Sequence, residues 1–318
     1  MNSVALATIA LLVEGFVGYP AALQQRIGHP VQWIGALITY LDDGLNDPEA
    51  TASSNRLNGV LALIALIVCC ALPAYIVVRL LGLVPYGWVL NIVIATAFIA
   101  QKSLSDHVQA VADVLPHSLA DARAAVSKIV GRDTTVLDES GVATATLETL
   151  AENASDGVVA PVLWYALLGL PGLVAYKAIN TADSMIGHKS EKFLNFGWAA
   201  ARLDDLINLP ASRLTGALFT LAALTHGKQA MQHARDAMWR DASKHNSPNA
   251  GWPEAAMAGA LGLQFGGPRS YQGEQVALPT MGNGRKPQTE KDITDGLSLF
   301  RNAMALLLLV GAILAIAL

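Results

Sequence analysis

Residues 152–213 gather acidic, amide and basic side chains on both sides of one apolar segment. The stretch opens with Glu152-Asn153-Ala154-Ser155-Asp156-Gly157, passes through the apolar run 158–179 and ends at Arg213. Ionisable side chains at membrane depth are costly, so they are usually functional. The alternative is that they form structural salt bridges that close a helix bundle. We favour the functional interpretation.

The carboxylates of this stretch are hard oxygen donors. Because histidine is scarce and cysteine is absent nearby, they favour Mg²⁺ over Zn²⁺. The candidates are Glu152, Asp156, Asp183, Asp204 and Asp205. Mg²⁺ commonly bridges nucleotide phosphates, and the matching cations would be Arg132, Lys189, Arg202, Arg213 and Lys244. The sequence has no Walker-type loop and no Gly-x-Gly-x-x-Gly after a strand, so any nucleotide site differs from the common soluble types.

A second polar cluster reads Ser243-Lys244-His245-Asn246-Ser247-Pro248-Asn249. Its dense donors and acceptors suit an anion. The alternative is a polar loop that caps the next helix through Ser247 or Asn249. The loop and its continuation Trp252-Pro253-Glu254 are longer than a cap requires, so we again favour a functional role.

Several single residues leave two interpretations open. His29 is held extended by Pro30 and is either a polar anchor or a substrate contact. Arg132 either pairs with Asp133 at a helix end or binds a phosphate. Ser184 and Ser247 could be nucleophiles, but neither has an identified base, so no Ser-His-Asp triad is assigned.

Composition indicates a polytopic membrane protein. The 318 residues are 53% hydrophobic and 14% charged, with a mean hydropathy of +0.41, whereas soluble domains carry about 25% charged residues. The net charge of −4 gives no sign of nucleic-acid binding. Nine of the 21 Lys and Arg residues lie between Lys228 and Arg301, which predicts that this region faces the cytoplasm. The adjacent Cys69 and Cys70 cannot form a disulfide framework or a metal knuckle.

The hydrophobic pattern predicts helices throughout. Residues 57–81 form the clearest membrane span, and 88–100 follow after a turn at 82–87, so the two predict a transmembrane hairpin. Residues 303–318 end the chain in the membrane. Residues 2–17 are apolar but short for a straight span and read as a retained membrane segment rather than a cleaved signal peptide.

Two regions have soluble character, 101–157 and 226–302, and both are expected to contribute to the site. The first should contain a helix at 104–115, a second helix capped by Ser118 that ends with Gly131 at its C′ position, and a third at 141–150. The second should contain helices at 228–242 and 255–263. We treat residues 1–318 as a single membrane domain.

The segment 158–179 poses a topological problem, because a single crossing would place its flanking motifs in opposite compartments. Gly169-Leu170-Pro171-Gly172 breaks the segment in its middle. We therefore expect a re-entrant helical hairpin, which is allowed where protein covers the broken backbone. The predicted fold class is an all-α, polytopic integral membrane helical bundle with broken or re-entrant helices and cytoplasmic helical loops.

Ordered motifs along most of the chain resemble the adenosylcobinamide-phosphate synthases, known as CobD or CbiB proteins. The matching pieces are Gly28-His29-Pro30-Val31 with Ile34-Gly35, Ala122-Arg123, Ile129-Val130-Gly131-Arg132-Asp133-Thr134, residues 152–161, residues 176–187, Phe196-Gly197-Trp198-Ala199 with Ala201-Arg202-Leu203-Asp204-Asp205, and residues 241–254. One departure is Gly18-Tyr19-Pro20, where the family usually has an acidic residue between glycine and proline, so no acidic role is assigned to that turn.

The resemblance implies a multi-pass ligase of the cell inner membrane whose active site faces the cytoplasm. Such an enzyme joins the free propionate of adenosylcobyric acid to an amino-alcohol phosphate, usually (R)-1-amino-2-propanol phosphate, and uses ATP and Mg²⁺. Its partners would be these substrates and the lipid bilayer, with no nucleic acid. Other membrane proteins of cobalamin assembly, or a second copy of the chain, could also associate with it.

Site roles follow from combining the resemblance with the residue chemistry. Catalytic roles go to Glu152, Asp156, Asp183 and Lys244, and metal ligation to Asp183, Asp204 and Asp205. Substrate and phosphate contacts go to His29, Arg132, Asn153, Asn180, Ser184, Lys189, Arg202, His245, Ser247 and Asn249. We expect these groups to meet in one pocket at the cytoplasmic edge of the bilayer. A transporter and a corrinoid-binding membrane scaffold are the alternatives.

Overall fold

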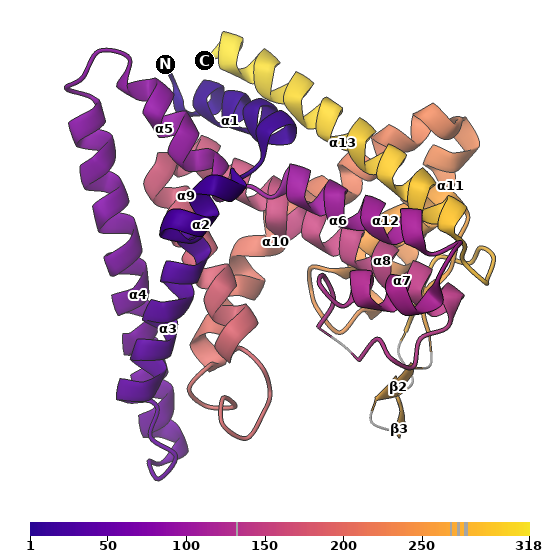
Figure 1. The fold of residues 1–318 in the computed structure, drawn as a ribbon, viewed down its shortest axis with the longest axis horizontal. Helices are drawn as coiled ribbons and strands as arrows, with labels where there is room; N and C mark the ends of the chain where they lie inside the picture. The colour runs from indigo at the N-terminus through magenta and orange to yellow at the C-terminus, as the bar shows by residue number, and fades with distance from the viewer. Residues whose placement is uncertain (132, 268, 272–273, 277–278) are drawn as a thin grey trace. The chain divides into compact units, whose positions relative to one another are not determined.

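The computed structural model describes residues 1–131, 133–267, 269–271, 274–276 and 279–318. Helices make up almost all of the described chain (Figure 1), which confirms the all-α class. The chain divides into two compact units. The first comprises residues 1–100, 160–208 and 311–318, and the second comprises residues 101–159 and 209–310. The expectation of one functional membrane domain stays a prediction.

The first unit is built around a central buried helix, α9. Its elements are α1 (Ser3–Val17), α2 (Ala21–Ile27), α3 (Pro30–Leu45), α4 (Ala52–Leu81), α5 (Gly87–Thr96), α9 (Ala160–Ile186), the first part of α10 (Trp198–Ala222) and the end of α13 (Glu290–Ala317). Helices α3 and α4 lie side by side (Figure 1), and α9 packs against α1, α3, α4 and α5. Tyr165 of α9 is fully buried and donates a hydrogen bond to Asn91 Oδ1 of α5 at 2.7 Å.

Three helix breaks in this unit share one tripeptide pattern, Gly-x-Pro. Gly18, Gly28 and Gly169 have φ of 64°, 73° and 68° with ψ of −168°, −176° and −165°. Only glycine populates this backbone region readily. Each glycine ends one helical stretch, and the proline two residues later stands at the start of the next, where its missing N–H costs nothing. The break predicted in the middle of 158–179 is thus confirmed at Gly169, while the re-entrant path stays a prediction.

The second unit packs small helices against each other. Its elements are α6 (Gln101–Val114), α7 (Leu119–Val126), α8 (Glu139–Asn153), the π-helix η1 (Ala154–Val159), the rest of α10, η2 (Ala223–His226), α11 (Lys228–Asp241), η3 (Ala242–Lys244), α12 (Gly251–Leu261) and most of α13. Helix α8 contacts α6, α7 and α12, and α12 lies along α11. A Cβ at Gly259 would lie 2.4 Å from the His233 carbonyl oxygen, so the small residues of α12 permit this close approach.

Four features differ from the sequence-based expectation. The short helix expected after residue 213 is the second part of a 25-residue helix, α10, which contains Pro210. The apolar stretch 303–318 belongs to a longer helix, α13, which begins at Glu290. Helix α7 is capped by Ser118 as expected but ends at Val126, so Gly131 is not its C′ residue and that prediction was wrong.

The fourth difference is a pair of short β-ladders, which the pattern of turn residues did not predict. Strand β1 (Phe265–Gly266) pairs antiparallel with β4 (Thr280–Met281), and β2 (Arg269–Tyr271) pairs antiparallel with β3 (Glu274–Val276). Pro268, part of an expected turn, lies outside the described residues.

Several helical stretches are long and apolar enough to cross a membrane. Within the described residues these are Ala52–Leu81, Gly87–Val114, Glu139–Ile186 and Glu290–Ala317, and the bent pair Ser3–Val17 with Ala22–Leu45 would make a fifth. The protein is therefore a polytopic helical membrane protein, as its composition predicts.

Candidate functional site

Asp204 is the buried centre of a hydrogen-bonded cluster where the end of α9 meets the start of α10. Its side chain is 7% exposed. Asn180 Nδ2 donates to Asp204 Oδ1 at 3.3 Å, and Asn208 Nδ2 donates to Oδ2 at 3.0 Å. Both carboxylate oxygens of Asp204 therefore accept a bond from a neighbouring amide.

Each amide is oriented by a further donor. Lys177 Nζ donates to Asn180 Oδ1 at 3.3 Å, and the Tyr176 hydroxyl donates to Asn208 Oδ1 at 2.9 Å. Because each amide oxygen is occupied in this way, each NH₂ group points at the carboxylate. Two hydrogen-bonded pairs, Lys177 with Asn180 and Tyr176 with Asn208, therefore converge on the carboxylate of Asp204.

Asp183 and Asp205 lie close enough to Asp204 to act on its charge. Burial raises the pKa of Asp204 to about 6; Asp183 and Asp205 add to the rise and the two amides oppose it. Burial also raises the pKa of Asp205, and the positive charges of Arg202 and Lys189 oppose that change. Three acids and two cations named from the sequence therefore share one electrostatic site in the first unit.

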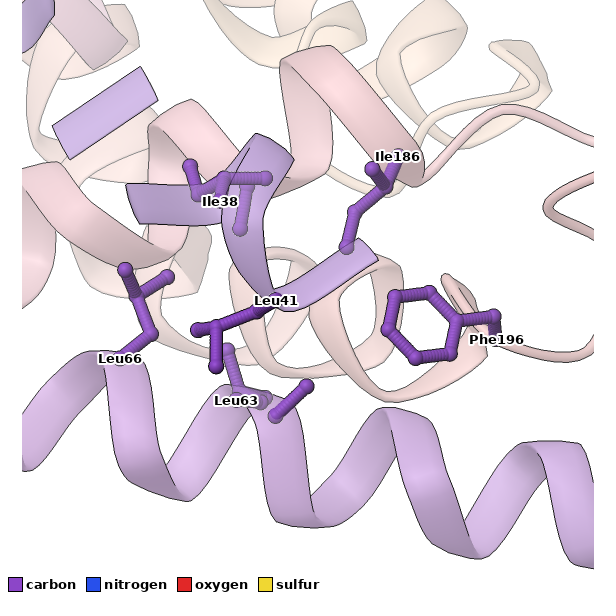
Figure 2. A pocket seen from close by; sticks show the side chains of 8 residues that line it. Ile38, Leu41, Leu63, Leu66, Ile186 and Phe196 are labelled. Atoms are coloured by element: carbon purple, nitrogen blue, oxygen red, sulfur yellow. The ribbon is translucent and has the colours of Figure 1, made fainter. Parts of the chain in front are cut away.

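The loop between α9 and α10 holds these acids in register. A Cβ at Gly187 would lie 2.0 Å from Asp183 Oδ1, and one at Gly197 would lie 1.6 Å from the Ile186 carbonyl oxygen. The two glycines thus let the loop close tightly beside Asp183. Phe196 is 1% exposed, and Figure 2 shows its ring with Ile186 among side chains of α3 and α4. Apolar packing therefore fixes the base of the loop.

His29 and Ser184 have local structural partners. His29 Nδ1 accepts a hydrogen bond from the Val31 N–H at 3.2 Å, so His29 caps α3 as a polar anchor would. The charge of Lys177 also acts on the His29 ring. Ser184 is exposed, and its hydroxyl donates to the Asn180 carbonyl oxygen at 2.9 Å.

Asp241 organises the second polar cluster, in the second unit. Its side chain is 2% exposed and binds Arg240, Lys244 Nζ at 2.7 Å and the Gly282 N–H at 2.9 Å. Although burial alone would raise it, these hydrogen bonds lower the pKa of Asp241 below its usual value. Lys244 therefore has a structural partner, while half of its side chain stays exposed.

The residues after Lys244 close onto α12. Ser247 Oγ accepts from the N–H groups of Asn249 and Ala250, both at 3.2 Å, in the turn before α12. The first residue before α12, Ala250, has no side-chain cap, so Ser247 orders this turn and is not the cap of the helix. His245 Nδ1 accepts from the Ser247 N–H at 3.0 Å, and His245 Nε2 lies 3.8 Å from Glu254 Oε1.

Asn249 is tied to α10 through two donors. It is 5% exposed, and its Oδ1 accepts from the Ser212 hydroxyl at 3.1 Å and from Arg213 Nη1 at 3.2 Å. The Arg213 guanidinium lies 4.6 Å from the centre of the Trp252 ring. This cation–π contact holds Arg213 over the loop.

The third set of expected residues surrounds the π-helix η1. Glu152 and Asn153 end α8, and Asn153 Nδ2 donates to the Thr149 carbonyl oxygen at 3.1 Å. Asp156 lies within η1, and π-helical turns often mark functional sites. Ser155 between them is 1% exposed, and its hydroxyl has no hydrogen-bond partner among the described residues. Such a buried, unpaired hydroxyl is unfavourable unless something else binds it.

The predicted residues thus fall into two groups by unit. Asp183, Asp204 and Asp205 come together with Asn180, Lys189 and Arg202 in the first. Glu152, Asn153 and Asp156, and separately Lys244, His245, Ser247 and Asn249, belong to the second. Arg132 lies outside the described residues. The single shared pocket stays a prediction.

Two observations bear on the metal site that the sequence predicts in the first unit. Across the described part of the chain, no three His, Cys, Asp or Glu side chains are arranged to hold a metal ion by themselves. Both oxygens of Asp204 are also engaged by amides. The predicted metal role of Asp183, Asp204 and Asp205 therefore stays a prediction.

Five further residues matter here that the sequence did not single out. Tyr176, Lys177 and Asn208 orient the Asp204 cluster, Asp241 anchors Lys244, and Ser155 carries the unpaired hydroxyl. Four of them lie inside the quoted motifs, so motif membership was an available signal. Asn208 lies outside the motifs, but it follows Asp204 by one helical turn, the spacing at which side chains meet on a helix.

Comparison with known proteins places this arrangement in a family. The sequence model described as CobD/CbiB protein matches residues 7–300. The chain belongs to the CobD/CbiB family. A CobD/CbiB relative from Sinorhizobium sp., named cobalamin biosynthesis protein CobD, is 49% identical over 98% of this chain and 97% of its own length. Proteins of the same name from Rhodobacter capsulatus and Brucella suis are each 47% identical, over 99% and 94% of this chain and 98% and 93% of their own. No solved structure matches the chain.

Proposed function

We propose that the protein acts in cobalamin biosynthesis as an ATP-dependent ligase. It would join the free propionate of adenosylcobyric acid to an amino-alcohol phosphate, such as (R)-1-amino-2-propanol phosphate, and release adenosylcobinamide phosphate. The observation that carries the proposal is the 49% identity, over 98% of the chain, to a protein named for cobalamin biosynthesis. The clustered acids, amides and cations support ligase chemistry.

The reaction requires an activated acid, because a carboxylate does not condense with an amine in water. A propionate oxygen would attack the terminal phosphorus of ATP, which forms an acyl phosphate and releases ADP. The amine nitrogen would then attack the acyl carbon, phosphate would leave, and the nitrogen would lose a proton to a base. Positive groups that stabilise the charge on the transferring phosphoryl group lower this barrier.

The residues of the first unit fit a Mg²⁺ ion that is shared with substrate phosphates. Mg²⁺ is usually held by one or two carboxylates plus phosphate oxygens and water. Asp183 and Asp205 would supply the carboxylates, and Asp204 would orient Asn180 and Asn208 beside them. The bound ion would neutralise phosphate charge. Lys189 and Arg202, whose charges reach Asp205, would bind the phosphates themselves.

The second unit supplies groups suited to the other substrates. Glu152 and Asp156 would contact the ammonium group of the amino alcohol, and Lys244 its phosphate. Ser155 offers an unpaired buried hydroxyl between these acids, which supports a ligand contact there. Asn153, His245 and Asn249 would orient the propionate and corrin amides.

Turnover by purified protein tests the proposal. The protein in detergent is given adenosylcobyric acid, ATP, Mg²⁺ and a panel of amino-alcohol phosphates, and the amide product, ADP and phosphate are quantified. We expect the three products in a 1:1:1 ratio with at least one amine. Asp183→Asn should lower turnover at least 100-fold. Asp113→Asn, at an exposed residue of α6, should leave turnover unchanged.

Other outcomes identify the alternatives. Tight corrinoid binding without ATP consumption would mean a scaffold, and corrinoid flux into sealed vesicles without amide formation would mean a transporter. Either result rejects the ligase.

A further inference from the structure

The first unit contains an apolar cavity of about 450 Å³ that the proposed chemistry does not use. Side chains of five helical segments line it, among them Leu23, Trp33, Cys70, Ile94 and Val174. They come from α2, α3, α4, α5 and α9 in that order, and all belong to one compact unit. The cavity is therefore a feature of the fold of that unit.

The cavity offers almost no polar partner to a ligand. Apart from the weakly donating thiols of Cys69 and Cys70, the donors among its lining side chains belong to Tyr19 and Trp33, and both donate to the backbone. The Tyr19 hydroxyl donates to the Gly28 carbonyl oxygen at 2.9 Å, and Trp33 Nε1 donates to the Ile27 carbonyl oxygen at 2.8 Å. A polar ligand would lose its hydration here without replacement, which is costly. The interior therefore suits a hydrocarbon.

Two lining residues, Cys69 and Cys70, lie in the middle part of a candidate membrane span. Cys69 and Cys70 are 12 and 11 residues before the end of α4 at Leu81, which places them roughly 17 Å from that end at the helical rise. Helix α4 is a candidate span, and the hydrocarbon core is about 30 Å thick. Trp33 and Val93 are 54% and 56% exposed, so they would face lipid. The cavity is thus accessible to lipid chains.

One lysine, Lys177, lies close in the chain to a lining residue of the cavity, and its Nζ donates to Asn180 Oδ1. Lys177 follows the lining residue Val174 by one turn of α9, and its charge acts on His29, which precedes the lining residue Pro30. The Tyr19 and His29 rings are in contact, with centroids 4.5 Å apart. A hydrocarbon chain inside the cavity could therefore carry an anionic group toward Lys177 and His29.

We propose that the cavity binds an acyl chain of an anionic bilayer phospholipid, with the phosphate directed toward Lys177 and His29. Lys177 also orients Asn180 of the Asp204 cluster, but lipid binding requires neither ATP nor a corrinoid, so it can be measured separately from the ligase reaction.

Lipid retention tests the proposal directly. The protein is reconstituted in vesicles of equal phosphatidylglycerol and phosphatidylcholine and extracted in mild detergent, and retained phospholipid is measured by native mass spectrometry. We expect one phosphatidylglycerol per chain, enriched at least fivefold over phosphatidylcholine. Ile94→Trp and Ala97→Trp, which fill the cavity, should lose it. The matched control Leu90→Trp, on α5 outside the cavity, should retain it.

A native thiol provides a second readout. In a Cys69→Ala background, Cys70 is the remaining cysteine, and its alkylation by a membrane-permeant maleimide is timed. Adding phosphatidylglycerol to delipidated protein should slow the reaction at least fivefold. Equal retention in all variants, no preference for phosphatidylglycerol, or protection of Cys70 by adenosylcobyric acid instead of lipid would overturn the proposal. Turnover of the ligase does not enter any of these readouts.

Discussion

At the scale of single residues, Asp204 combines burial with a complete set of donors. Isolated buried carboxylates are expensive, and amide donors reduce that cost. The two amides cannot turn away, because Lys177 and Tyr176 hold their oxygens. A site built in this way is preorganised before any substrate arrives, which is what positioning chemistry requires.

Asp204 predicts a specific pH dependence of stability. Its pKa rises from 3.8 to about 6 in the folded protein, so the folded state binds the proton more tightly than the unfolded state. Its stabilising contribution is complete below pH 4 and is lost as pH rises to about 6. The loss amounts to roughly 2–3 kcal/mol. We expect the difference in melting temperature between wild type and Asp204→Asn to change across this window, measured without divalent cations. If the melting temperatures of the two proteins change with pH in parallel, the raised pKa of Asp204 is contradicted.

Lys244 predicts a separation of activity from stability. Its ammonium group binds the buried Asp241 at 2.7 Å, but Arg240 and the Gly282 N–H also hold that acid. Lys244→Ala should therefore cost less than about 1 kcal/mol of stability, while turnover falls at least tenfold.

Lys192→Ala is the matched control. It breaks the same type of pair, between a largely exposed lysine and the buried Asp42 at 2.7 Å. This variant should retain turnover. Equal losses of turnover in the two variants would mean that Lys244 has only a structural role.

The unpaired hydroxyl of Ser155 leads us to expect that its removal raises stability and lowers activity. Ser155→Ala removes a buried hydroxyl that has no partner in the described part of the chain, so it should stabilise the protein by about 1–3 kcal/mol and lower turnover. Thr146→Val on α8 is the control, because the Thr146 hydroxyl already donates to the Val142 carbonyl oxygen at 2.8 Å. The control should be slightly less stable and fully active. Unchanged turnover in Ser155→Ala would show that the hydroxyl has no ligand.

At the scale of elements, the three Gly-x-Pro breaks replace loops. A helix ends on a glycine conformation that other residues avoid, and the next helical stretch begins at or directly after a proline, where the missing N–H costs nothing. A Gly-x-Pro break keeps the non-helical segment between two helices short, so that few backbone N–H and C=O groups lack a helical partner at membrane depth.

Substitution of Gly169 tests whether the glycine conformation is required at these breaks. A Cβ there would meet only Pro171, at 3.7 Å, so Gly169→Ala should lose stability through its backbone conformation alone, by about 1–3 kcal/mol. Gly44→Ala is the matched control. It lies within α3, a Cβ there meets nothing within 4 Å, and the change should stabilise the helix by up to about 1 kcal/mol. Thermal unfolding of both variants in detergent measures the contrast, and equal stabilities would refute it.

Elements were predictable from sequence where one local signal dominated. Ser118 marked the start of α7, and Gly169-Leu170-Pro171 marked a break, because caps and backbone restrictions act within a few residues. The length of α10 was missed, because Pro210 reads as a helix breaker and only tertiary packing shows that the helix continues. Likewise, the acids of the first unit could be named, but their orienting partners Tyr176 and Asn208 become visible only when α9 and α10 lie together.

At the scale of the whole molecule, charge distribution predicts the orientation in the membrane. The cationic region 228–301 should face the cytoplasm, and the turn between α4 and α5 should face the other side. In a background without Cys69 and Cys70, Gln229→Cys should react with an impermeant maleimide in inside-out vesicles. Val84→Cys should react in right-side-out vesicles. The reverse pattern would place the acids and cations of the second unit outside the cytoplasm and remove their access to ATP.

The Gly-x-Pro breaks also bear on how the chain enters the bilayer during synthesis. A segment inserts on its own when about 20 consecutive apolar residues present themselves together. Helix α1 has 15 residues and α2 has 7, and the stretches 160–168 and 170–186 on either side of Gly169 are also shorter than that threshold. These pieces must therefore partition cooperatively with longer neighbours such as α4, so the order of translation and the order of assembly need not coincide.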